Sequence, residues 1–146
     1  MTGLRPVLIV EDNANDLELM LEALRDNKLA NSVDVTRDGE EALAYLRREG
    51  GFRGRSLVDP VVVLLDLKMP KVDGLEVLRT VRADVRLRSI PIVMVTSSRE
   101  EQDLVDSYHL GVNAYVVKPV DFQGFASAVR QLGAFWAVLN EPPPSG

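Results

Sequence analysis

The chain has 146 residues, of which 46% are hydrophobic and none is a cysteine. This length and apolar content suit one domain with a substantial core, and the lack of thiols excludes disulfides and thiolate zinc sites. The one histidine, His109, excludes a multi-histidine metal site and leaves a Ser-His-Asp hydrolase a single candidate for its base. A net charge of −5 argues against broad binding to nucleic acid.

The chain carries no membrane or export signal in its sequence. No stretch approaches the roughly 20 apolar residues of a membrane span, and the N-terminus lacks the apolar core and cleavage site of a signal peptide. We therefore expect a soluble, cytoplasmic protein. Residues 1–140 are predicted to form its single domain, and residues 141–146 a short Pro-rich tail.

The first predicted strand is the apolar run at residues 7–10, which ends at Glu11 and Asp12. A helix follows, and Asn13 or Asn15 can cap its N-terminus. Apolar residues recur along this helix at helical spacing, so one of its faces is predicted to be buried. That face carries Leu17, Met20, Leu21 and Leu24.

The second strand is predicted within residues 32–37, where apolar and polar residues alternate as they do near a sheet edge. A helix over about residues 39–48 comes next and is expected to stop at Gly50 and Gly51. The stretch 49–60 is long for a connection inside a compact α/β domain, so a surface loop is expected there.

The third strand is the most apolar part of the chain, and it ends at a carboxylate. Residues 61–65 are all Val or Leu, and Asp66 follows them. A strand of this kind is typically covered on both faces of a sheet. A helix and then a fourth strand over residues 90–95 are predicted after it, with Thr96 at the end of that strand. The helix is expected to bury Leu75, Val77, Leu78 and Val81.

A fourth helix is predicted from about residue 99 to 110, closing at Gly111. The fifth strand covers residues 114–117 and ends at Lys118, and the last helix runs from about residue 122 to 140. Five strands that alternate with five helices make an α/β, doubly wound parallel sheet, because each parallel crossover needs a helix.

Polar side chains follow four of the five predicted strands: Glu11 and Asp12, then Asp66, Thr96 and Lys118. The carboxyl ends of parallel strands lie at one edge of a sheet, so these residues can converge there. Crowded carboxylates repel one another unless one is protonated or a cation balances them. Mg²⁺ prefers oxygen ligands, and a carboxylate beside it can be the nucleophile of a phosphoryl transfer.

Four segments, VEDN, LLDLKMPKVDG, PIVMVTS and AYVVKPV, stand in this order along the chain. Together they resemble the signatures of response-regulator receiver domains, the CheY-like family, over roughly residues 6–140. The resemblance implies a flavodoxin-like sheet of order 2-1-3-4-5 with an extended C-terminal helix. In that order the first and third strands are neighbours, so Asp12 would lie close to Asp66.

The resemblance also implies a phosphorylation site. By position, Asp66 resembles the phosphoacceptor, and Glu11 and Asp12 resemble the acidic pair that positions Mg²⁺ with Asp66. The backbone carbonyl of Lys68 would be a further metal ligand. Glu11 stands where Asp is more frequent in the family, so this longer acid can act on the metal through water.

A second set of residues resembles the switch of the family. Thr96 matches the hydroxyl that binds a phosphoryl oxygen, and Lys118 matches the cation that pairs with the phosphoryl group. The bond before Pro119 is expected to be cis. Tyr115 matches the aromatic switch that turns inward when Thr96 moves toward the phosphate, although such an aromatic could equally be a half-buried residue of an edge strand.

The long loop at residues 49–60 and the ending GAFWAVLNE resemble single-domain regulators associated with bacterial phytochromes. In that group the last helix takes part in homodimers, and Phe135 and Trp136 continue the apolar stripe of this helix. The resemblance thus implies a stand-alone response regulator that accepts a phosphoryl group from a sensor histidine kinase, with a bacterial phytochrome as candidate, and that binds neither nucleic acid nor membrane.

Three other functions remain open. The protein could be a phosphorelay intermediate, which passes the phosphoryl group on. It could be a phosphatase with Asp66 as nucleophile, but such enzymes have a second Asp two residues later, where this chain has Lys68. It could also be an interaction module that works without phosphorylation. A stand-alone response regulator, the function that the resemblance implies, would be a phosphoacceptor rather than an enzyme.

Overall fold

The computed structural model describes residues 5–25, 32–54, 59–69, 71–106, 108–112 and 114–131. Five parallel strands form one sheet in the order β2-β1-β3-β4-β5, as the resemblance implied. The strands are β1 (Val7–Val10), β2 (Val33–Thr36), β3 (Val62–Asp66), β4 (Ile92–Thr96) and β5 (Ala114–Val117).

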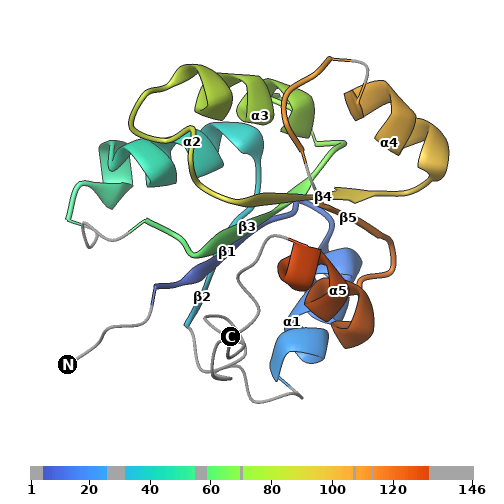
Figure 1. Ribbon diagram of the computed structural model, residues 1–146. Coiled ribbons are helices and arrows are strands. Elements are labelled where there is room, and N and C mark those ends of the chain that lie inside the picture. Colours follow the sequence, from blue (N-terminus) through green and yellow to red (C-terminus); the bar gives the residue numbers. More distant parts are fainter. Residues whose placement is uncertain are drawn as a thin grey trace, which may run out of the picture.

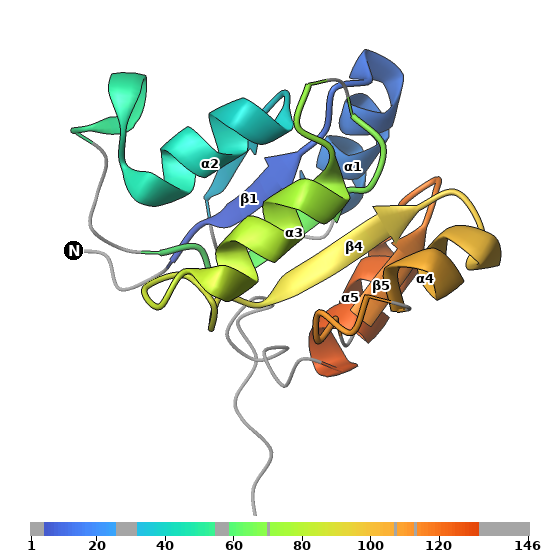
Figure 2. The same cartoon turned by 90° about the horizontal axis from the view of Figure 1, so that it is seen from above.

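Five α-helices cover the two faces of this sheet (Figure 1). Helices α1 and α5 lie on one face, and α2, α3 and α4 lie on the other, where Figure 2 shows α2 beside α3, and α4 on the far side of β4. None of the helices in the described ranges has the length and apolar character that a membrane crossing requires. The helices are α1 (Ala14–Arg25), α2 (Gly39–Arg47), α3 (Gly74–Ala83), α4 (Arg99–Asp106) and α5 (Phe122–Gln131), and a short 3-10 helix, η1, spans Gly50–Phe52.

The core has two parts, one on each side of the sheet. All four residues of β1 and all five of β3 are buried, which is why both strands read as continuous apolar runs. On one face Ile9 and Leu64 pack with Phe125 of α5. On the other face Leu8 and Leu65 are in the cluster that α2 and α3 complete. The two central strands are therefore held rigidly from both sides.

One predicted helix end was wrong, and so was one predicted stop signal. Helix α4 ends at Asp106 rather than near residue 110, because the N–H groups of Tyr108 and His109 bond to carbonyls three residues back. His109 then takes a left-handed conformation with φ 53°, which ends the helix before Gly111. Helix α2 is closed by Arg48, also left-handed, and not by the glycines that follow it.

Several expectations fall on residues outside the described ranges. These are the last helix beyond Gln131, with Phe135 and Trp136, and the tail at residues 141–146. They stay predictions.

Candidate functional site

The carboxyl ends of β1, β3, β4 and β5 bring the predicted polar residues to one edge of the sheet. The parallel register aligns Val10 with Leu65, so Glu11 and Asp66 each come next on neighbouring strands. The register also aligns Thr96 with Val117, and the N–H of Lys118 donates to the carbonyl of Thr96 at 2.8 Å. Strand order and register alone thus gather the acids, the hydroxyl and the lysine.

Three carboxylates form a cluster at this edge. Oxygens of Glu11, Asp12 and Asp66 all lie within 4.8 Å of one another. Glu11 is fully buried and Asp66 is 3% exposed, while Asp12 is half-buried. The oxygen Oε2 of Glu11 accepts the N–H of Asn13 at 3.1 Å. The cluster is a compact, oxygen-only donor set of the kind that hard divalent cations bind.

The ammonium group of Lys118 lies against the cluster and contacts three carboxylates. Its Nζ is 3.2 Å from Oδ1 of Asp66, 3.3 Å from Oε1 of Glu11 and 2.9 Å from Oδ2 of Asp16. The peptide bond between Lys118 and Pro119 is cis, as the resemblance implied. Lys118 therefore reaches the acids of β1 and β3 from the far side of β4.

Burial changes the acidity of these groups. It raises the pKa of Glu11 from 4.5 to about 7, and the neighbouring Asp66 carboxylate reinforces the shift. Burial likewise raises the pKa of Asp66, although Glu11 and Lys118 oppose this. Burial lowers the pKa of Lys118, but Asp16, Asp66 and Glu11 outweigh burial and raise it. Lys118 thus stays charged, and a further cation would stabilise the ionised form of the acids.

Three buried oxygens at the site have no hydrogen-bond partner among the described residues: Oε1 of Glu11, Oδ2 of Asp66 and Oγ1 of Thr96. Oε1 of Glu11 still has the Lys118 ammonium 3.3 Å away, which leaves the pair of Oδ2 of Asp66 and Oγ1 of Thr96. Thr96 is only 1% exposed. Buried polar atoms are normally paired, and an unpaired one costs about 1–3 kcal/mol. The pair thus marks a place where a ligand could supply the missing contacts.

Tyr115 on β5 is half-buried and reaches α4 with its hydroxyl group. This hydroxyl donates to Oδ1 of Asp106 and lies 3.5 Å from the carbonyl of Gln102. Burial and the Asp106 carboxylate raise the pKa of the phenol. The side chain therefore connects β5 to α4, and its hydroxyl contacts no residue of the acid cluster.

Lys68 lies in the loop that follows β3, and Gly74 is the first residue of α3 after that loop. The side chain of Lys68 is exposed and pairs with Glu101 at 3.0 Å. A Cβ added to Gly74 would lie 2.1 Å from the carbonyl oxygen of Asp66. Helix α3 therefore begins against the backbone of Asp66, and only a residue without a side chain fits there.

Two residues at the site were missed by the sequence reasoning. Asp16 lies in the first turn of α1 and makes the shortest contact of Lys118. Arg37 follows β2 and donates to the carbonyls of Glu11 at 3.1 Å and Asp12 at 2.9 Å. The strand-end rule applied to β2 would have found Arg37. Asp16 could have been found from its position one helical turn beyond the acidic pair.

The sequence matches the family model of the response regulator receiver domain over residues 7–130. The probable methanogenesis regulatory protein FilR2 of Methanothrix harundinacea is 41% identical over 138 residues, which cover 94% of this chain and 86% of that protein.

Two solved structures extend the comparison. The bacteriophytochrome response regulator AtBRR is 64% identical with a TM-score of 0.90, and the match covers 96% of this chain and 100% of that one. The Mn²⁺-bound form of response regulator Rcp1, a protein of Synechocystis sp., is 33% identical with a TM-score of 0.74, and 97% and 99% are covered. Because the family model spans most of the chain and these relatives align along nearly all of it, the protein belongs to the response-regulator receiver family.

Proposed function

We propose that this receiver accepts a phosphoryl group on Asp66 from a sensor histidine kinase. Phosphorylation-dependent signalling is the function of the family. The observation that carries the proposal for this chain is a buried carboxylate, Asp66, with a lysine ammonium 3.2 Å from one oxygen and its other oxygen unpaired among the described residues. A carboxylate in this setting can attack phosphorus while the lysine balances the charge.

The transfer requires few groups from the protein. An oxygen of Asp66 forms a bond to phosphorus as the bond from phosphorus to the histidine nitrogen of the kinase breaks. The ammonium group of Lys118 is held where it would contact one oxygen of the transferred group, and the hydroxyl of Thr96 can donate to another oxygen. Positioning and charge neutralisation supply most of the catalysis in reactions of this type.

Mg²⁺ is the proposed cofactor, held by Glu11, Asp12, Asp66 and the backbone carbonyl of Lys68. The residues present fit this ion, because three carboxylates lie within 4.8 Å and Oδ2 of Asp66 lacks a partner in the described structure. When bound, Mg²⁺ neutralises the charge of the acids and of the incoming phosphoryl oxygens. A related response regulator, Rcp1, has been solved in a Mn²⁺-bound form, which supports the binding of a divalent ion by this receiver.

The response to phosphorylation is proposed to involve Thr96 and Tyr115. A phosphoryl group on Asp66 would draw the unpaired hydroxyl of Thr96 toward it, leaving space for the ring of Tyr115. The tyrosine hydroxyl would then leave Asp106, and α4 would lose that contact. Phosphorylation would in this way shift an equilibrium between two arrangements of α4 and β5.

A bacterial phytochrome is the proposed kinase partner, supported by the similarity to bacteriophytochrome response regulators. Homodimers through the last helix, action as a single-domain regulator and a cytoplasmic location are parts of the same proposal. So is the view that the protein turns over no external substrate. A phosphorelay intermediate remains the second candidate, because it would use the same site.

The test is phosphorylation by a small phosphodonor such as acetyl phosphate with Mg²⁺, followed by intact-protein mass spectrometry. One phosphoryl group is expected on the wild type and none with chelator or on Asp66→Asn. Equal labelling of Asp66→Asn would refute the site. Multiple turnover of an added phosphoester would favour a phosphatase, and partner binding unchanged by the phosphodonor would favour the phosphorylation-independent module.

A further inference from the structure

The shortest contact of the Lys118 ammonium is with a residue outside the proposed metal and phosphoryl sites. Nζ lies 2.9 Å from Oδ2 of Asp16, against 3.2 Å and 3.3 Å to Asp66 and Glu11. The side chains of Lys118 and Asp16 are 19% and 29% exposed, so the pair is partly shielded from water. Lys118 is thus shared between α1 and the acid cluster.

Asp16 is held in place by the start of α1, which lies on the same face of the sheet as α5 (Figure 1). The side chain of Asn13 caps this turn and accepts the N–H of Asp16 at 2.9 Å. The N–H of Asn13 in turn donates to Oε2 of Glu11. One capped turn therefore fixes Glu11 on one side of the ammonium group and Asp16 on the other.

The same carboxylates attract both Lys118 and a divalent cation. A lysine ammonium is a compact charge on a flexible stem, so its position depends on the balance of the anions around it. Without the charge of Asp16, attraction toward Glu11 and Asp66 would be unopposed. The ammonium group would then move further onto the oxygens that a metal ion needs.

We propose that Asp16 is a positioning residue that draws Lys118 toward α1 and thereby leaves Glu11 and Asp66 available to a divalent cation. This inference rests on the proposed function, because it assumes that Mg²⁺ binds the acid cluster. It assigns to Asp16 an effect on metal affinity that passes through Lys118. Asp16 could otherwise be only an acid in the first turn of a helix, where it would stabilise α1 without affecting the metal.

The test measures Mg²⁺ binding by isothermal titration calorimetry to full-length protein without phosphodonor. Asp16→Asn is expected to weaken binding about fivefold, as the loss of one partly screened charge contact allows. Glu18→Gln is the matched control, because it removes an acid from an exposed position of the same helix. It should change the affinity by less than about twofold. Circular dichroism and the urea midpoint check folding, and Asp16→Ser replaces the asparagine variant should that variant not fold.

A double-mutant cycle with Lys118→Met shows whether Asp16 acts through the lysine. In the Lys118→Met background, Asp16→Asn should have no more effect than Glu18→Gln. The same fivefold loss in both backgrounds would mean that Asp16 acts on the metal directly, and it would overturn the inference. If the wild type binds Mg²⁺ and Asp16→Asn binds it with the same affinity, the inference is overturned and the proposed function stands. Absence of Mg²⁺ binding by the wild type would overturn the proposed function with it.

Discussion

The raised pKa of Glu11 predicts how the stability of the metal-free protein depends on pH. The carboxyl group of Glu11 has a pKa of about 7 in the folded protein, against an ordinary value of 4.5. The folded state therefore binds the proton more tightly than the unfolded chain. The contribution of Glu11 is complete below about pH 4.5 and is lost as the pH rises through about 7.

The size of this effect follows from the same two values. A difference of one pH unit in pKa corresponds to about 1.4 kcal/mol, so Glu11 accounts for about 3 kcal/mol of unfolding free energy across this range. Burial also raises the pKa of Asp66, which acts in the same direction. Such a loss is a large fraction of the roughly 5–15 kcal/mol that stabilises a typical domain.

The assay is urea unfolding between pH 5 and 7.5 in the presence of a chelator, with Glu11→Gln as the comparison. Glutamine has no proton to lose in this range, so the unfolding free energy of the Glu11→Gln variant should change less than that of the wild type. Saturating Mg²⁺ should restore the stability of the wild type near pH 7.5, because the ion binds the ionised acids. A wild-type curve that runs parallel to that of Glu11→Gln would show that the proton of Glu11 does not cause the pH dependence.

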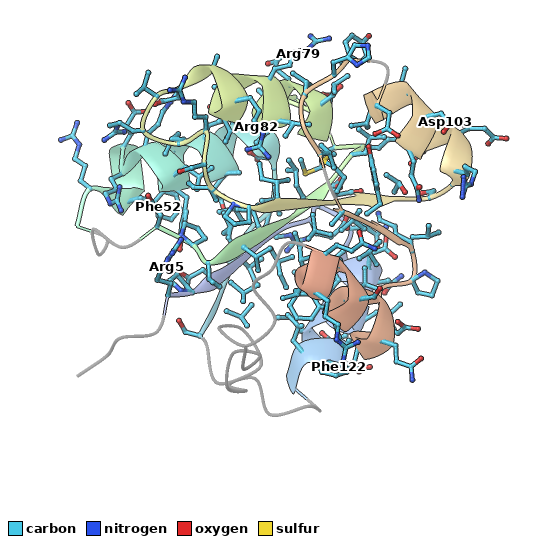
Figure 3. All side chains as sticks on the ribbon, in the orientation of Figure 1. Arg5, Phe52, Arg79, Arg82, Asp103 and Phe122 are labelled. Atoms are coloured by element: carbon cyan, nitrogen blue, oxygen red, sulfur yellow. The ribbon has the colours of Figure 1, made fainter. Side chains whose placement is uncertain are left out.

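Three further predictions concern single contacts, each measured by urea unfolding. Gly74→Ala should destabilise the protein by more than about 2 kcal/mol and reduce the phosphoryl labelling of Asp66, because its Cβ would lie 2.1 Å from the carbonyl oxygen of Asp66. Gly51→Ala is the control, because Gly51 has open space around it, and it should be near neutral. Equal effects of the two substitutions would contradict this prediction. Arg82→Met should lower the unfolding free energy by about 2 kcal/mol, because the guanidinium of Arg82 (Figure 3) donates to the carbonyls of Leu110, Arg88 and Ile90. Arg86→Met, at an exposed position, should lower it little. Equal losses would argue against a stabilising role of the Arg82 hydrogen bonds. Tyr115→Phe should lower the unfolding free energy by about 1 kcal/mol, because the hydrogen bond to Asp106 is lost. Tyr108→Phe keeps the ring that the Arg79 guanidinium covers at 4.6 Å, so it should be neutral. Equal losses would speak against the contact between Tyr115 and Asp106.

The central part of the fold could be predicted from the sequence because β1 and β3 are buried on both faces. A strand covered on both sides leaves a continuous apolar run, and its end is marked by the first charged residue, as at Glu11 and Asp66. The side-by-side placement of these two strands came from the family resemblance. Periodicity alone does not give strand order.

The end of α4 and the role of Asp16 were not accessible in the same way. Only Val105 of α4 is buried, so the helix leaves a weak apolar pattern and its end depends on a local left-handed turn at His109. The contact between Asp16 and Lys118 joins residues 102 positions apart. It depends on the direction in which α1 leaves the sheet, which sequence spacing does not encode.

Chemical reduction can locate the phosphoryl group and thus tests directly whether Asp66 is the phosphoacceptor. Borohydride converts an aspartyl phosphate to homoserine, which peptide mass spectrometry assigns to one position. After treatment with a phosphodonor and Mg²⁺, we expect homoserine at position 66 and at no other. Unmodified Asp66 in a protein that has gained a phosphoryl group would rule out Asp66 as the phosphoacceptor.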